Sequence, residues 1–113
     1  MKPKKLKSVV ALPVSNKNKY EATFLLEGGG EKKIRFGAQG MRDFTLLNNK
    51  SSRFYLPQKK QREKIKENYQ RRHKKDLLTE KNKIGFGAGA LSYYLLWTTP
   101  KMNISAYRKR FNL

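Results

Sequence analysis

The chain has 113 residues, with 27 lysines and arginines against eight aspartates and glutamates, and it has no cysteine. A chain of this length forms one domain with a modest core. At a formal net charge of +19, the positive side chains repel one another in the compact state unless a partner neutralises them. We therefore expect a polyanion, an acidic protein surface or an anionic lipid surface as partner. The lack of cysteine excludes a disulfide framework, a thiolate metal site and a thiol nucleophile.

Residues 1–19 are predicted to form a basic tail, residues 1–7, followed by a short strand at Ser8–Val14. β-branched residues favour the strand, and Pro13 places it at a sheet edge because proline cannot donate a hydrogen bond to a ladder. The apolar runs behind the tail and at Ala88–Trp97 are too short for a signal peptide or a membrane span. We therefore expect no membrane-spanning segment.

Residues 20–100 are predicted to form the compact α+β domain, and a β-hairpin opens it. Residues 20–27 and 31–36 each alternate between apolar and polar side chains, as half-buried strands do. The glycines at 28–30 supply the positive φ of a tight reversal. The predicted apolar face consists of Tyr20, Ala22, Phe24, Leu26, Ile34 and Phe36. Together with the strand at residues 8–14, the hairpin predicts a three-stranded antiparallel sheet.

The hairpin is followed by a bend with two glycines, Gly37 and Gly40. The bend is expected to bring Phe44 back against the apolar face of the hairpin, and Asp43 can cap a turn through its side-chain oxygen. A phosphate-binding loop also uses glycines, but it requires a helix N-terminus and a lysine at a set spacing. We interpret this segment as structural.

A basic helix is predicted from Pro57 to Lys75, where strong helix formers follow a proline suited to the first helical position. Its apolar stripe is thin, with Ile65, Tyr69, His73 and Leu77 at intervals of four residues. We expect this helix to rest one narrow edge on the sheet and to present its basic side to solvent or a partner, with Glu67 able to reach Arg71. His73 is the only histidine, so we predict packing or a hydrogen bond for it rather than a metal site.

The segment Ile84–Trp97 is apolar and contains Gly85, Gly87 and Gly89 in alternation. This spacing differs from the dinucleotide-binding pattern G-x-G-x-x-G, whereas small residues allow another element to approach closely. We predict an apolar helix or segment that covers the sheet; the alternative is an aromatic platform for bases or an anchor in a partner. Residues 101–113 are predicted to form a second basic tail, with Ile104, Tyr107 and Phe111 as docking points.

These elements predict an α+β fold: a small three-stranded antiparallel sheet, a basic helix, a C-terminal apolar helix or segment, and basic tails. The sequence contains no recognisable pair of carboxylates, Ser-His-Asp arrangement or metal-binding cluster. We therefore expect no enzymatic activity, catalytic residue, metal or cofactor. Without a known groove-reading motif, nucleic acid would be bound through its phosphates. The residues predicted to bind a partner or nucleic acid are Lys59, Lys60, Arg62, Arg71, Arg72, Lys74, Lys75, Trp97, Tyr107, Arg108, Lys109, Arg110 and Phe111.

Four short motifs lie in order between Lys32 and Lys101. They are K-K-I-R-F-G-A-Q-G at residues 32–40, D-F-T at 43–45, Y-x-x-R-H-K-K at 69–75 and G-A-L-S-Y-Y-L-L-W-T-T-P-K at 89–101. In these motifs the chain resembles a family of small basic proteins of uncharacterised function from large nucleocytoplasmic DNA viruses, the giant viruses of algae and amoebae. Family members commonly carry a histidine after the second motif and a tryptophan after the third, where this chain has leucine pairs.

The resemblance implies a viral origin, synthesis in the host cytoplasm and a place in the virion. We therefore expect a non-enzymatic minor capsid or cement protein that joins larger capsid proteins, with Trp97, Tyr107 and Phe111 as anchors in their pockets. The alternative is a sequence-independent nucleic-acid-binding protein of the virion core that packages or condenses the genome. The surface of an inner membrane is a further candidate partner. We expect no small-molecule substrate.

Overall fold

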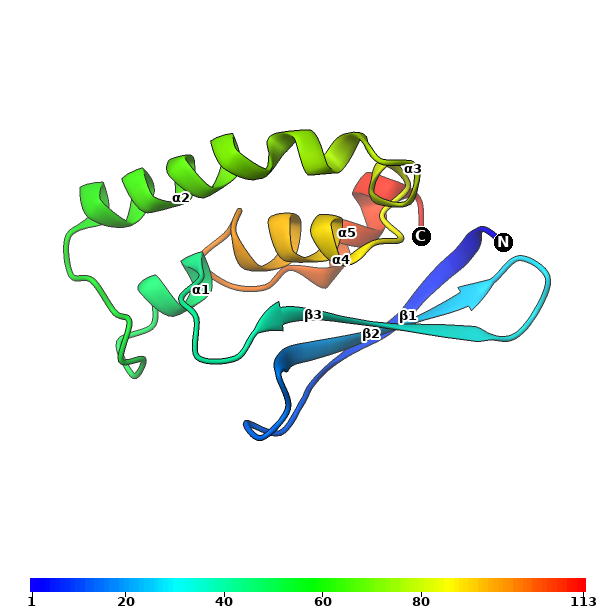
Figure 1. Ribbon diagram of the computed structural model, residues 1–113, viewed down its shortest axis with the longest axis horizontal. Helices are drawn as coiled ribbons and strands as arrows, with labels where there is room; N and C mark the ends of the chain where they lie inside the picture. The colour runs from blue at the N-terminus through cyan, green and yellow to red at the C-terminus, as the bar shows by residue number, and fades with distance from the viewer.

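The computed structural model describes all 113 residues and has an α+β fold, as predicted (Figure 1). The strands are β1 (Pro3–Ala11), β2 (Asn18–Leu26) and β3 (Glu31–Ala38), which form one antiparallel sheet in the order β1-β2-β3. The α-helices are α1 (Phe44–Leu47), α2 (Lys59–His73), α3 (Glu80–Lys83), α4 (Ala88–Leu91) and α5 (Ile104–Phe111). A 3₁₀ turn, η1 (Lys74–Leu78), prolongs α2, and a π-helical turn, η2 (Ser92–Leu96), prolongs α4.

The predicted hairpin is formed by β2 and β3. Tyr20 pairs with Phe36 in the antiparallel register, and their rings stack with centroids 5.6 Å apart. Phe24 and Phe36 are fully buried, so the predicted apolar face of the hairpin is the core face of the sheet. Two of the three turn glycines, Gly29 and Gly30, have the positive φ that the reversal requires.

Strand β1 begins at Pro3 and ends at Ala11, so the prediction of a basic tail over residues 1–7 is wrong. The physical reason is Leu6, which pairs with Phe24 and is completely buried. Irregularities in the register on either side of Leu6 adjust the strand so that one apolar residue of a lysine-rich run reaches the core. The predicted position of this strand at the sheet edge is confirmed.

The apolar segment before Pro100 covers the core face of the sheet, as the sequence predicted. Figure 1 shows α4 between the sheet below and α2 above. The rings of Phe86 and Phe24 pack edge to face with their centroids 5.1 Å apart. The core also includes Leu91, Leu95 and Leu96 from α4 and η2. Close packing here depends on Gly37, since a Cβ at this position would lie 2.9 Å from Leu96.

Helix α2 lies farther from the sheet than predicted. Since α4 and η2 occupy the core face, α2 packs on α1, on Tyr93 of η2 and on Trp97 just after η2, and none of its residues is fully buried. It begins at Lys59, two residues after Pro57, and ends at His73. None of the helices combines the length and the hydrophobicity that a membrane span requires.

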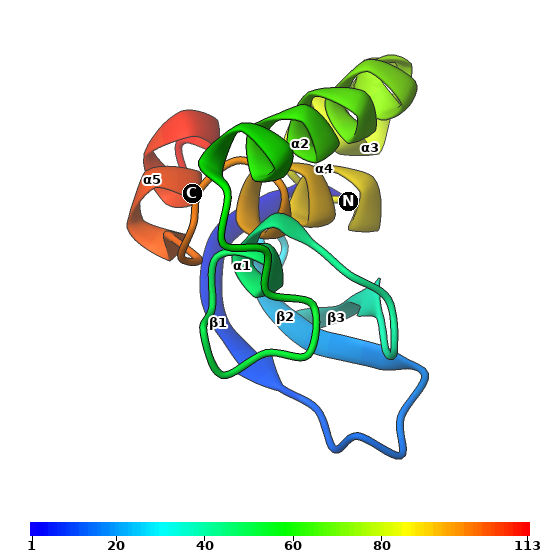
Figure 2. The same ribbon diagram turned by 90° about the vertical axis from the view of Figure 1, so that its left-hand side faces the viewer.

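Residues 104–111 form helix α5, so the prediction of a basic tail over residues 101–113 is wrong. Asn103 caps its start by accepting from the backbone N–H of Ala106 at 2.9 Å, and Asn112 ends it in the left-handed conformation with φ of 56°. Figure 2 shows α5 beside β1. There Arg108 donates from Nε to the carbonyl of Leu6 at 2.9 Å, which joins the two ends of the chain.

Candidate nucleic-acid interface

The outward side of α2 and η1 carries a row of exposed basic side chains. Helical periodicity brings residues four apart onto one side, and Lys60 and Lys64 share that side with Arg71 and Lys75. The α2 basic face is defined here as the exposed residues Lys60, Lys64, Arg71, Lys74 and Lys75. Glu67 is the acidic residue exposed among them. A 15-residue helix is about 22 Å long, so the face can follow several phosphates.

Few of the basic residues are neutralised inside the chain. Of the 27 lysines and arginines, only five take part in ion pairs, namely Lys7, Lys19, Lys33, Arg35 and Lys66, which leaves 22. Three of the five lie on the outer face of the sheet, opposite Glu21 and Glu31. The Lys7 ammonium, hydrogen-bonded to Glu31, lowers the pKa of that carboxyl. The α2 basic face has no such partner, and its charge is free for a polyanion.

Most of the basic residues predicted on α2 lie where a partner could reach them. Lys59, Lys60, Arg71 and Arg72 are exposed, as are Lys74 and Lys75 in η1. Arg62 is the exception.

Arg62 turns inward and donates from its Nη1 to the carbonyls of Leu56 and Pro57 at 2.7 and 2.9 Å. It therefore holds the loop before α2 to the helix, and these two donor interactions are made within the chain rather than with a partner. Its Nε is buried without a hydrogen-bond partner.

The two largest predicted aromatic anchors are part of the core. Trp97 is 8 % exposed and Tyr107 is 2 % exposed, and the Tyr107 hydroxyl donates to the carbonyl of Gly85 at 2.8 Å. The expectation that they fill pockets on a partner is therefore wrong. Tyr107 is buried because the apolar stripe of α5 packs inward, with Phe111 half-buried against Tyr107 and Tyr94. Trp97 is covered by the stacked ring of Tyr69.

The basic residues of the predicted C-terminal site lie on α5 and differ in exposure. Arg108 is half-buried and occupied with the carbonyls of β1. Arg110 is exposed and lies over the Tyr94 ring at 4.3 Å, and Lys109 is exposed beside it. Only these last two basic residues of α5 are open to a partner.

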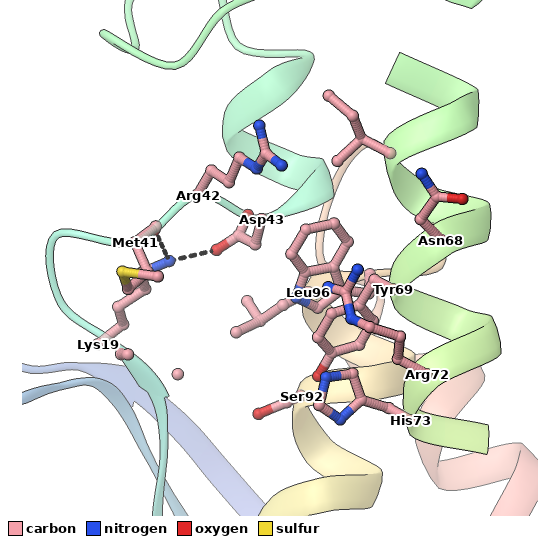
Figure 3. A pocket seen from close by; sticks show the side chains of 14 residues that line it. Lys19, Met41, Arg42, Asp43, Asn68, Tyr69, Arg72, His73, Ser92 and Leu96 are labelled. Atoms are coloured by element: carbon pink, nitrogen blue, oxygen red, sulfur yellow. Dashed lines mark hydrogen bonds and ion pairs between the residues drawn. The ribbon is translucent and has the colours of Figure 1, made fainter. Parts of the chain in front are cut away.

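A cavity of about 400 Å³ lies beside the α2 basic face, between α2, η2 and the loop from β3 to α1 (Figure 3). Its polar lining includes Lys19, Arg42, Asp43, Asn68, Tyr69, Arg72, His73 and Ser92. Figure 3 shows Lys19, Arg42 and Asp43 on one side and the α2 residues on the other. We call it the α2 pocket.

Asp43 is a buried carboxylate whose hydrogen-bonding capacity is used within the chain. Its Oδ2 accepts from the Lys19 ammonium at 2.7 Å, and its Oδ1 accepts from the Thr45 hydroxyl and from the backbone N–H of Leu46. The last bond caps α1, which confirms the predicted capping role of Asp43. Lys19 also donates to the carbonyl of Met41 at 2.6 Å.

A stack of three rings fixes α2 on Trp97, the residue that follows η2. The ring of Tyr69 lies 4.1 Å from the Trp97 ring with an interplanar angle of 6°, and 4.2 Å from the His73 ring. His73 Nδ1 lies 2.9 Å from an Asp76 carboxylate oxygen, so the lone histidine both packs and forms a hydrogen bond, as predicted. Burial, with a smaller contribution from Asp76, raises the pKa of Tyr69 to about 12.

Three other tyrosines have a raised pKa, and burial is the main cause in each. The charge of Asp43 adds to the effect of burial on the pKa of Tyr20. Tyr94 does the same for the pKa values of Tyr93 and Tyr107. These hydroxyls stay neutral across the physiological range, which agrees with their place in or near the core.

Lys64 and the α2 pocket were not predicted from the sequence. The spacing of Lys64, four residues after Lys60, is a signal that could have found it. Lys19, Arg42 and Arg72 carry no such signal, because they come together only through the packing of distant segments.

Comparisons of the chain with family models, with curated proteins and with solved structures found no match.

Proposed function

We propose that this protein is a non-enzymatic protein that binds nucleic acid without sequence preference, with the α2 basic face as its main contact. The observation that carries the proposal is the row of exposed lysine and arginine side chains on α2 and η1, which have almost no acidic partner. Basic side chains on one helix neutralise backbone phosphates, which look alike in every sequence. The resemblance to proteins of large DNA viruses supports the virion core as the setting.

The salt dependence of DNA binding tests this proposal. Neutralising phosphates releases counterions, so six to ten contacts lower affinity about a thousandfold or more between about 50 and about 200 mM salt. We expect the logarithm of the DNA-binding constant to fall linearly with the logarithm of the salt concentration in fluorescence anisotropy titrations. The slope of this line should be the same for two duplexes of unrelated sequence. A variant with Gln in place of Arg71, Arg72, Lys74 and Lys75 should have a slope smaller by about 2 to 4, since each phosphate contact contributes about 0.9.

A charge-matched variant separates a local interface from general attraction. Replacing Lys4, Lys17, Lys50 and Lys101 by Gln removes the same charge from exposed positions outside α2, η1 and α5. This variant should keep most of the slope, and both variants should melt close to the wild type. Equal losses in the two variants would contradict a defined interface, and unfolding of the α2 variant would show that its basic face is structural.

A minor capsid or cement role is the second candidate. The observation in its favour is a cavity of about 710 Å³ bordered by Leu12, Val14, Met41 and Phe54, where Val14 is 90 % exposed. Apolar side chains exposed together at one cavity suit a protein partner.

Particles that contain the protein can decide between the two candidates. After genome release, nuclease treatment and a wash at moderate salt, our proposal expects the protein to leave with the genome. Retention on the emptied shell would overturn the nucleic-acid proposal and support the capsid role.

A further inference from the structure

The α2 pocket has a surplus of positive charge that the chain itself does not use. Arg42 and Arg72 line it, and neither takes part in any of the six ion pairs. The only hydrogen bonds that a lining side chain makes to another lining residue are those of Lys19 to Met41 and Asp43, and neither arginine side chain forms one (Figure 3). The donors of both arginines are therefore available to a ligand.

The one carboxylate in the pocket does not oppose an anion strongly. Asp43 is 2 % exposed and is compensated by the Lys19 ammonium, the Thr45 hydroxyl and a backbone N–H. An ammonium has three donors, and Lys19 uses two of them within the chain. The pocket thus combines a partly used ammonium with two unpaired guanidinium groups, which favour planar or tetrahedral oxyanions.

The size and position of the pocket limit the class of ligand. Its volume of about 400 Å³ lies in the range of small-molecule sites, which leaves room for a sugar beside a phosphate. Lys60, Lys64, Asn68 and Arg72 follow one another at intervals of four residues, so one row on the helix runs from the α2 basic face to the pocket. A strand held on the face has a direct path to it.

We infer that the α2 pocket binds a phosphomonoester, and that in the protein's complex with nucleic acid it holds the terminal phosphate of a strand. A terminal phosphate carries a second negative charge that an internal phosphodiester lacks, and it can enter a pocket that a continuous backbone cannot. The terminal assignment rests on the proposed function, whereas binding of a free phosphomonoester does not.

Two single-stranded oligonucleotides of one sequence test the inference, one with a 5′-phosphate and one with a 5′-hydroxyl. Because charge-assisted hydrogen bonds are the strongest available here, we expect the phosphorylated strand to bind about tenfold more tightly. Arg42→Gln with Arg72→Gln should abolish this ratio. Arg71→Gln with Lys74→Gln, which removes the same charge outside the pocket, should weaken both strands and leave the ratio unchanged.

Titration with small ligands separates this inference from the proposed function. Inorganic phosphate and AMP are added to ¹⁵N-labelled full-length protein, with adenosine as control. Shifts of the backbone amides at residues 37–43 with AMP but not adenosine support the pocket even if neither oligonucleotide binds. Shifts with inorganic phosphate as well would assign recognition to the phosphate group alone. Equal affinity for the two strands overturns the terminal assignment, and an absence of shifts with both anions overturns the pocket.

Discussion

Phe36 is the side chain at which the sheet meets the helices that cover it. It is 1 % exposed and stacks on Tyr20. Phe36→Ala would remove a large ring from a packed site and should lower the free energy of unfolding by about 3–5 kcal/mol. Urea denaturation followed by circular dichroism measures this loss. Val10→Ala, at a half-exposed position, should stay within about 0.5 kcal/mol of the wild type; a similarly small change for Phe36→Ala would contradict the core assignment.

The buried ion pair of Lys19 with Asp43 is a second point of stability at this scale. Lys19→Met leaves the Asp43 carboxylate buried without its cation, and loss of one partner from such a pair costs about 3–5 kcal/mol. Asp43→Asn retains a side-chain oxygen that can cap α1. The double variant should therefore be more stable than the sum of the single losses predicts. A double-mutant cycle measures the coupling, and strictly additive losses would show that the two groups act independently.

At the scale of elements, strict alternation and helix-forming composition were the reliable signals. Alternation from Tyr20 to Phe36 predicted the hairpin and its buried face, and the run of helix formers predicted α2. The start of β1 was hidden because Leu6 stands alone among lysines, and its burial depends on pairing with Phe24. Helix α5 was hidden for a similar reason, since the basic residues around Tyr107 resemble a solvated tail unless the core that receives the ring is known.

Tyr69 couples α2 to η2 and makes that contact sensitive to alkaline pH. An unfolded tyrosine has a pKa of about 10, and the pKa of Tyr69 in the folded chain is raised to about 12. The folded state therefore holds this proton more tightly, and the associated stability is present below about pH 10 and lost as the pH rises toward about 12. We expect the stability difference between the wild type and Tyr69→Phe to shift against the wild type across this window in urea denaturation. A pH-independent difference would contradict the burial of the hydroxyl.

For the whole molecule, the candidate interface divides into a part that the sequence could predict and a part that it could not. The basic residues of α2 are neighbours along one helix, so composition and spacing predicted most of them, although Lys64 was missed. The α2 pocket joins Lys19, Arg42, Arg72 and Ser92 from four separate segments, and only the packed structure places them together. Trp97 and Tyr107 were misassigned because an aromatic residue beside basic ones has the same sequence pattern whether it is an exposed anchor or part of the core.

The net charge of +19 should itself limit stability when no polyanion is bound. With 22 of 27 basic residues outside any ion pair, repulsion acts over the entire surface and is screened within a Debye length of about 10 Å at about 0.1 M salt. We expect the melting temperature to rise as sodium chloride increases from about 0.05 to about 0.5 M.

A short DNA duplex should raise the melting temperature further at low salt, because it binds the folded chain, and this gain should vanish at high salt. The variant with Gln at Arg71, Arg72, Lys74 and Lys75 is the control. It carries less repulsion and a weaker interface, so it should gain less from sodium chloride and less from the duplex. Thermal melts at the two salt concentrations, with and without duplex, measure the effect of salt and the effect of the duplex for the wild type and for the variant. A melting temperature that falls with added salt would show that the ion pairs on the outer face of the sheet outweigh the repulsion, and it would contradict this account of the charge.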